Sequence, residues 1–116
     1  MATAMYYQRG ESLDYANSTS SKIAANTVIE LKDRIGVVGC DINPGETGSL
    51  HMTGVFEMGK TGSAKIEMGQ KVYFDGTGIT DDADDGGSPA NAYTPAGYAV
   101  AEAAAADTKI LVKLQG

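Results

Sequence analysis

Glycine and proline divide this sequence into short apolar pieces along nearly its whole length. Fifteen glycines and three prolines are scattered through 116 residues instead of being gathered in one linker. The pieces between them have the length of β-strands, and their spacing is typical of all-β domains. We therefore predict an all-β fold, a small single-domain β-barrel or β-sandwich with little helix.

Seven pieces have the composition expected of strands. In the last of them, Lys109–Leu114, Ile110, Val112 and Leu114 alternate with the other three residues. This alternation gives one apolar face and one mixed face. The other predicted strands are Ser12–Ala16, Thr27–Leu31, Gly36–Cys40, Ser49–Met58, Lys71–Asp75 and Tyr98–Glu102.

Three segments fit a strand less well. The alanine-rich segment 99–106 has helix propensity, but it has room for only about two turns, so we favour a strand followed by a turn. The segment 17–26 is small and polar, which indicates a loop or a short helical turn. The segment 76–95 is glycine-rich and acidic, and we expect it to be an exposed loop.

Charge and composition exclude several classes of function. Nine Lys and Arg against fifteen Asp and Glu give a net charge of −6, which disfavours binding to a nucleic-acid backbone. A single cysteine and a single histidine exclude an internal disulfide and a thiolate-rich or histidine-rich metal site. No apolar run approaches the roughly 20 residues of a membrane span, and the N-terminus does not resemble a signal peptide. We therefore expect a protein made in the cytoplasm, with no membrane partner.

The segment Gly54–Thr61 matches the phosphate-binding pattern G-x-x-x-x-G-K-[ST]. A functional loop of this kind needs a flexible turn at 55–58 and a long helix after Thr61. Here 55–58 resembles a strand, and Gly62 and Gly69 leave no room for that helix. We interpret 59–62 as a hairpin turn, and keep a nucleotide-binding or recombination protein as the alternative function.

Other candidate sites have simpler structural interpretations. Asp81, Asp82, Asp84 and Asp85 could form a loose calcium site, but a solvated acidic loop is favoured because the EF-hand spacing is absent. His51 lacks a nucleophile motif, and we expect Cys40 to be a buried small hydrophobic residue. Asn17-Ser18-Thr19 forms a glycosylation sequon that has meaning only in a secretory pathway. We therefore expect no catalytic residue, no metal and no cofactor, and hence no enzyme.

The first ten residues differ from the rest of the chain. Met5, Tyr6 and Tyr7 are apolar but do not alternate as a strand would, and Arg9 adds a cation. Aromatic side chains bring a large contact area at low entropic cost. We predict an N-terminal arm at 1–10 that contacts a partner, followed by a β domain at 11–116. A frayed first strand is the alternative.

The predicted core is small for the length of the chain. Leu, Ile, Val and Phe make up about 18 % of the residues, a level close to that of disordered chains. A marginal core of this kind is often completed by self-association.

The order of the pieces is similar to that in a known family. Ile35-Gly36-Val37-Val38 is followed by a short Asp/Pro/Gly connection, then by Gly54–Met58, Gln70–Asp75 and a closing segment, 97–114. This order resembles the capsid decoration, or cement, proteins of tailed bacteriophages, over roughly 11–116. Some members of that family are described as RecA/RadA-like recombinases.

The resemblance implies a non-enzymatic protein of the virion that binds the outer capsid surface between capsomers and reinforces the mature shell. Its partner would be the major capsid protein, and its assembly a homotrimer at local three-fold positions. Within this expectation, Met5, Tyr6, Tyr7 and Arg9 are the predicted capsid contacts. The acidic insertion at 81–92 and the turn at Gly59-Lys60 depart from the family pattern. A different virion surface module, one that touches host carbohydrate, is a further alternative.

Overall fold

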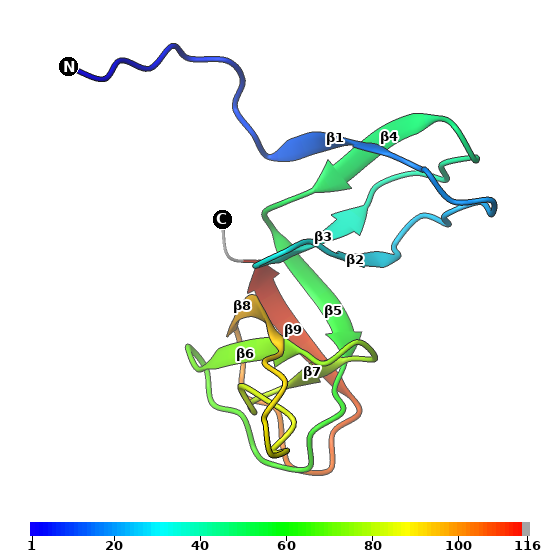
Figure 1. The fold of residues 1–116 in the computed structure, drawn as a ribbon. Helices are drawn as coiled ribbons and strands as arrows, with labels where there is room; N and C mark the ends of the chain where they lie inside the picture. The colour runs from blue at the N-terminus through cyan, green and yellow to red at the C-terminus, as the bar shows by residue number, and fades with distance from the viewer. Residues whose placement is uncertain (115–116) are drawn as a thin grey trace.

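The computed structural model describes residues 1–114, and these contain nine β-strands and no helix (Figure 1). The all-β prediction is therefore confirmed. No helix in this part of the chain could cross a membrane. The strands are β1 (Ser12–Ala16), β2 (Val28–Glu30), β3 (Ile35–Val38), β4 (Thr47–His51), β5 (Val55–Gly59), β6 (Lys71–Phe74), β7 (Ile79–Thr80), β8 (Thr94–Ala99) and β9 (Lys109–Leu114).

The strands form two antiparallel sheets that are not closed into a barrel. The first sheet has the order β1-β4-β3-β2, and the second has the order β5-β9-β8-β6-β7. Figure 1 shows the two sheets as separate bodies joined by the chain between β4 and β5. The fold is thus built from two sheets in sequence, each completed by its own stretch of chain.

The predicted strand Ser49–Met58 is wrong as a single element. The structure divides it into β4 and β5, which belong to different sheets. The break lies at Gly54, whose φ of 119° is a backbone conformation that residues with a side chain rarely adopt. Apolar residues occur on both sides of Gly54, so the sequence predicted one strand, but the backbone turns at this glycine.

The same arrangement of four strands occurs twice in the chain. We call residues 12–52 the first unit and residues 55–114 the second unit. When β1, β4, β3 and β2 are replaced by β5, β9, β8 and β6, the strand order of one sheet becomes that of the other. Cross-strand partners also correspond, as in Leu13↔Leu50 and Phe56↔Val112. The second unit differs by β7 and by the long insertion that carries it, residues 75–93.

The loops of the two units are closed by equivalent hydrogen bonds. Ile23 and Ile42 exchange two backbone hydrogen bonds of 2.9 and 2.8 Å, and Ile66 and Ala103 do the same at 2.9 and 2.8 Å. Each of these four residues is followed at once by a four-residue turn. The turns are therefore fixed at matching places in the two sheets.

Three of the four turns need a residue in the left-handed region at their third position. Asn26, Gly45 and Gly69 occupy it with φ values of 72°, 82° and 87°. Glycine and asparagine adopt this conformation at least cost, which explains their presence. Three of the four turns are also closed by a side chain, since Glu46, Gln70 and Asp107 accept the N–H of the residue three positions earlier, at 3.2, 3.0 and 2.8 Å.

Each unit has an apolar cluster that includes side chains from its strands and from the loops closed by these hydrogen bonds. Seven core positions can be matched between the units: all seven are buried in the second unit, whereas four of their counterparts in the first are only partly buried. The equivalent pairs are Tyr15/Met58, Ile23/Ile66, Ile29/Val72, Leu31/Phe74, Val38/Ala99, Ile42/Ala103 and Leu50/Val112.

The first unit also contributes side chains to the core of the second. Ile35 and Val37, on the opposite face of β3 from Val38, are 2 % and 4 % exposed and belong to the cluster of the second unit. Beside them, the Thr94 hydroxyl donates a hydrogen bond to the Glu30 carboxylate. One face of the first sheet is therefore a contact surface within the chain.

Candidate functional site

The phosphate-binding pattern at Gly54–Thr61 does not form a phosphate-binding loop. Its middle residues are β5, and the next regular strand is β6, with no helix between them. Lys60 is 8 % exposed, and its Nζ donates to the carbonyl oxygens of Gly62 at 2.8 Å and Ala105 at 3.2 Å. The amine that would reach a phosphate is thus used to hold two loops together.

The predicted hairpin turn at 59–62 is also wrong. β5 pairs with β9 along its whole length and does not pair with β6. The residues at 59–62 are typical of a turn, but β5 pairs with the distant strand β9, so the chain does not fold back into a hairpin here.

Asn17 occupies the position in the first unit that Lys60 occupies in the second. It is 1 % exposed, and its amide nitrogen donates to the carbonyl oxygens of Ser21 at 2.8 Å and Ile42 at 2.9 Å. Its side-chain oxygen accepts the N–H of Thr19 at 2.9 Å. The sequon asparagine is therefore a buried structural residue, which sequence reasoning missed.

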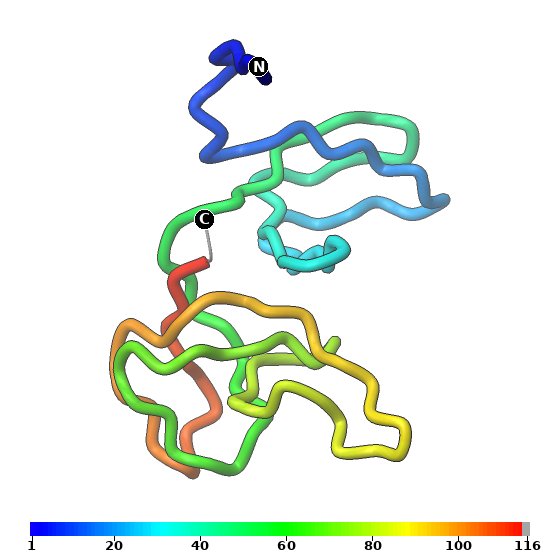
Figure 2. The backbone as a smooth tube through the Cα atoms, turned by 60° about the vertical axis from the view of Figure 1, so that its left-hand side comes forward, coloured from blue at the N-terminus to red at the C-terminus, as the bar shows by residue number. Residues whose placement is uncertain are grey.

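The acidic segment is an exposed loop with its own internal structure. Figure 2 shows 75–93 projecting from the second unit, away from the N-terminal arm. The Asp85 carboxylate accepts three hydrogen bonds: from the backbone N–H of Asn91 at 3.0 Å, from the side-chain amide of Asn91 at 2.8 Å and from the N–H of Gly87 at 2.8 Å. The bonds from Asn91, followed by that from Gly87, lower the pKa of Asp85 to about 2.

One detail of this region was not predicted. Ile79 and Thr80 form the buried strand β7, so the predicted loop 76–95 is not exposed throughout. No group of three or more His, Cys, Asp or Glu residues in 1–114 is placed to hold a metal ion. The four aspartates at 81–85 do not converge as calcium ligands must.

Cys40 and His51 have structural surroundings. Cys40 is exposed, contrary to the prediction, because β3 ends at Val38 and the chain leaves the sheet there. His51 Nδ1 lies 3.1 Å from the Ser12 hydroxyl, and its ring is tilted against Phe56 at 6.2 Å between centroids. In the described residues no carboxylate is hydrogen-bonded to His51, so the serine and the imidazole do not form a catalytic triad.

The predicted capsid contacts lie on an extended arm. Residues 1–10 form no strand, and Figure 1 shows them running away from both sheets. Met5, Tyr6 and Tyr7 are 93 %, 83 % and 90 % exposed. Arg9 lies at the base of the arm, where it pairs with Glu11 at 3.7 Å. These residues share one segment and present their apolar surface to solvent.

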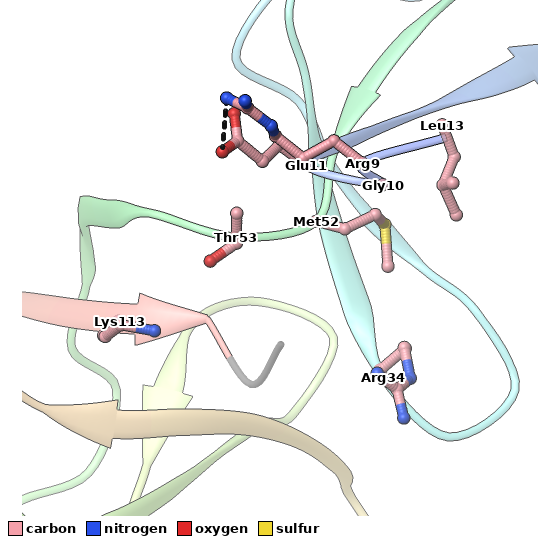
Figure 3. Close-up of a pocket in the computed structure, with 8 residues that line it drawn as sticks. All are labelled: Arg9, Gly10, Glu11, Leu13, Arg34, Met52, Thr53 and Lys113. Carbon is pink, nitrogen blue, oxygen red and sulfur yellow. Dashed lines mark ion pairs between the residues drawn. The ribbon is translucent and has the colours of Figure 1, made fainter. Parts of the chain in front are cut away.

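A cleft of about 580 Å³ lies at the base of this arm (Figure 3). Arg9 and Arg34 line it from the first unit and its arm, and Lys113 lines it from the end of β9. Three cations and one carboxylate, Glu11, make this cleft basic although the whole chain carries a charge of −6.

A second exposed surface is the outer side of the second sheet, which we call the open face. Register places Val55, Lys113, Tyr98 and Lys71 side by side across β5, β9, β8 and β6. Leu111 lies in the next row, beside Glu57. The aliphatic and aromatic members are unusually exposed for large apolar residues: Val55 53 %, Tyr98 42 % and Leu111 41 %.

The sequence carried a signal for this surface. Leu111 stands between Lys109 and Lys113 on the mixed side of the alternating strand Lys109–Leu114. An apolar residue on the solvent side of a strand is an indication of contact with a partner. The other strands that complete the row could not be paired with it from sequence alone.

The comparisons with known proteins assign the chain to a family. A family model described as phage cement protein matches residues 7–114. The chain belongs to this family. A search of curated proteins and a search of solved structures each gave no match. As a cement protein it is a structural component associated with the phage capsid. The matched region includes Tyr7 and Arg9 of the arm but begins after Tyr6.

Proposed function

We propose that this cement protein binds the outer surface of the capsid between capsomers and stabilises the mature shell against the pressure of the packaged DNA. Its direct partner would be the major capsid protein. The observation that carries the proposal is the exposed arm, whose Met5, Tyr6 and Tyr7 leave a large apolar area in water. Such side chains are typical anchors of protein interfaces.

Self-association as a homotrimer is part of the proposal. Residues of the first unit's core such as Tyr15 and Ile29 are only partly buried, so contact with a neighbouring copy would remove further apolar surface from water. Many copies that each clamp adjacent capsomers would strengthen a shell through avidity. The protein would be made in the host cytoplasm and then bind the assembled head.

The test uses phage particles that lack this protein and the purified full chain. Addition of the protein should saturate a fixed number of sites per particle and raise the temperature at which the particles release their DNA. Particles that bind the protein without any gain in heat resistance would contradict the stabilising role. Absence of binding would contradict the cement function at this surface.

Deletion of Met1–Gly10 tests the arm directly. We expect the truncated protein to unfold within about 0.5 kcal/mol of the full chain, because the arm is exposed and joins no strand. Its occupancy on particles should fall at least ten-fold. As a matched control, deletion of Met1–Ala4 alone leaves Met5, Tyr6 and Tyr7 in place, and this variant should bind normally. Equal occupancy of the deletion variant would contradict the assignment of Met5, Tyr6, Tyr7 and Arg9.

A further inference from the structure

The open face of the second sheet differs from the equivalent face of the first. In the first sheet this face carries Ile35 and Val37, which are buried against the second unit. In the second sheet the position equivalent to Val37 is Tyr98, which is 42 % exposed, against 4 % for Val37. This face of the sheet is thus covered by the other unit in the first unit and exposed to solvent in the second.

The open face combines apolar and cationic side chains in a regular pattern. Across one row, Val55, Lys113, Tyr98 and Lys71 alternate between apolar and cationic from strand to strand. Neighbours in such a row have Cβ atoms about 5 Å apart, so the four side chains form a continuous surface. Isolated exposed apolar residues are ordinary, but a contiguous set marks a contact surface.

The charge of this face is opposite to that of the whole molecule. Lys71, Lys109 and Lys113 lie on it together with the carboxylate of Glu57. A second carboxylate, Glu102, borders the face beside Lys109 and Leu111, where it forms an ion pair with Lys65. Within residues 1–114, none of the three lysines on the face takes part in an ion pair. Lys71 Nζ lies 5.4 Å from the centre of the Tyr73 ring, which holds this cation close to the sheet. Lys113 also lines the basic cleft, so the two positive surfaces meet at the end of β9.

We propose that the open face docks onto the capsid, at a patch whose carboxylates surround apolar side chains. This inference rests on the cement function proposed above and gives that function a second contact beside the arm. The charge pattern determines the occupant: the lysines require an acidic partner, and Val55, Tyr98 and Leu111 require an apolar centre. A second copy presenting the same face would bring its lysines against these lysines, which disfavours a symmetric pair.

The test measures binding of charge-reversed variants to particles that lack the protein. Lys71→Glu combined with Lys113→Glu should weaken binding at least ten-fold, and the wild-type affinity should fall as salt is raised. Lys32→Glu, compared with Lys71→Glu alone, is the matched control, since it makes the same change of charge on an exposed residue of the first unit that forms no ion pair within residues 1–114. The control should bind within two-fold of the wild type.

Two further variants separate charge from packing. Lys71→Arg combined with Lys113→Arg keeps both cations and should preserve binding. Leu111→Thr retains strand propensity but removes the apolar contact, and should weaken binding about five-fold or more. Thermal unfolding of every variant verifies that the fold is retained before its binding is compared.

The outcomes distinguish this inference from the broader function. If the wild type binds particles and the Lys71→Glu/Lys113→Glu variant binds equally well, the open face is not a capsid contact, and the cement function stands. If the reversal instead converts an oligomer to monomers in sedimentation experiments while each copy still binds particles, the occupant is a second copy and the proposal is overturned. If the wild type does not bind, both proposals fail.

Discussion

The first and second units share a strand order and a set of loop hydrogen bonds, but their side chains differ at nearly every equivalent position. Of the seven equivalent core pairs, only Ile23/Ile66 keeps the same residue. At the end of their first strands, Asn17 and Lys60 perform the same task with different chemistry, each donating to two loop carbonyls. The backbone pairing defines this unit, and many combinations of apolar side chains fill it.

The conserved isoleucine gives the sharpest test of how the two cores differ. Ile66 is fully buried, whereas Ile23 is only partly buried. We expect Ile66→Ala to lower the free energy of unfolding by about 4 kcal/mol and Ile23→Ala by about 2 kcal/mol, because a cavity costs more where the surroundings are fully packed. Urea unfolding followed by circular dichroism measures both. Equal losses would mean that the two cores are equally tight.

The buried polar pair tests whether the two loop anchors are equivalent. Asn17→Ala removes a donor to two carbonyls and an acceptor for Thr19 N–H, and should cost about 3 kcal/mol. Lys60→Met keeps most of the apolar stem and removes only the donor, so it should cost about 1–2 kcal/mol. Neither variant should alter the oligomeric state. A Lys60→Met protein as stable as the wild type would show that the lysine anchor is dispensable.

The insertion at 75–93, which makes the second unit longer than the first, should contribute little to the free energy of unfolding. Replacement of Asp85–Asn91 by two glycines keeps β7 and removes only exposed residues. We expect a change in the free energy of unfolding of less than about 1 kcal/mol, because shortening an exposed loop alters the closure entropy only slightly. Thermal unfolding provides the measurement. A loss of several kcal/mol would place this loop in the folded core of the second unit.

The smallest effect concerns pH, and it again contrasts the two units. The N–H of Ala25, helped by Lys22, lowers the pKa of Asp41 in the first unit, and the bonds from Asn91 and Gly87 lower the pKa of Asp85 to about 2 in the second. Because this value lies below the roughly 3.9 of an unfolded chain, the contribution of Asp85 is complete above pH 4 and is lost as the pH falls towards 2.

Nuclear magnetic resonance titration measures this directly. Between pH 4 and 2 the Asn91 amide should lose its protection from exchange, while the amides of β8 and β9 keep theirs. In Asp85→Asn the Asn91 amide should be unprotected at neutral pH as well. If the Asp85 carboxyl instead titrates near 4, the hydrogen bonds from Asn91 and Gly87 to this carboxylate are not formed in solution.

Sequence predicted the class of the fold and several elements to the residue, but it did not reveal the repeat. The predicted strands Ser12–Ala16 and Lys109–Leu114 were correct at both ends, and the second of them follows from its alternation. The repeat leaves only a short match, Ser20-Ser21-Lys22-Ile23 against Ser63-Ala64-Lys65-Ile66, and the insertion in the second unit then shifts the alignment. A pattern conserved in hydrogen bonds but not in side chains gives sequence reasoning little to detect.

The candidate surfaces were predictable to different degrees. The arm was visible because Met5, Tyr6 and Tyr7 break the alternation near one end of the chain. The open face was not, because its rows join residues from four strands whose pairing depends on the whole sheet. Burial of Lys60 and exposure of Cys40 were missed for the same reason: each depends on where a distant segment lies.

The position of β9 has a consequence for the order of events during synthesis. In the first unit every strand has been synthesised once His51 is made, so that sheet can close while translation of the second unit continues. In the second unit the last strand lies between β5 and β8, so β5 has no partner until Lys109–Lys113 emerges. During that interval the edge of β5 and its apolar side chains stay open to other chains. The half of the molecule with the tighter core is therefore the half that is exposed longest to aggregation.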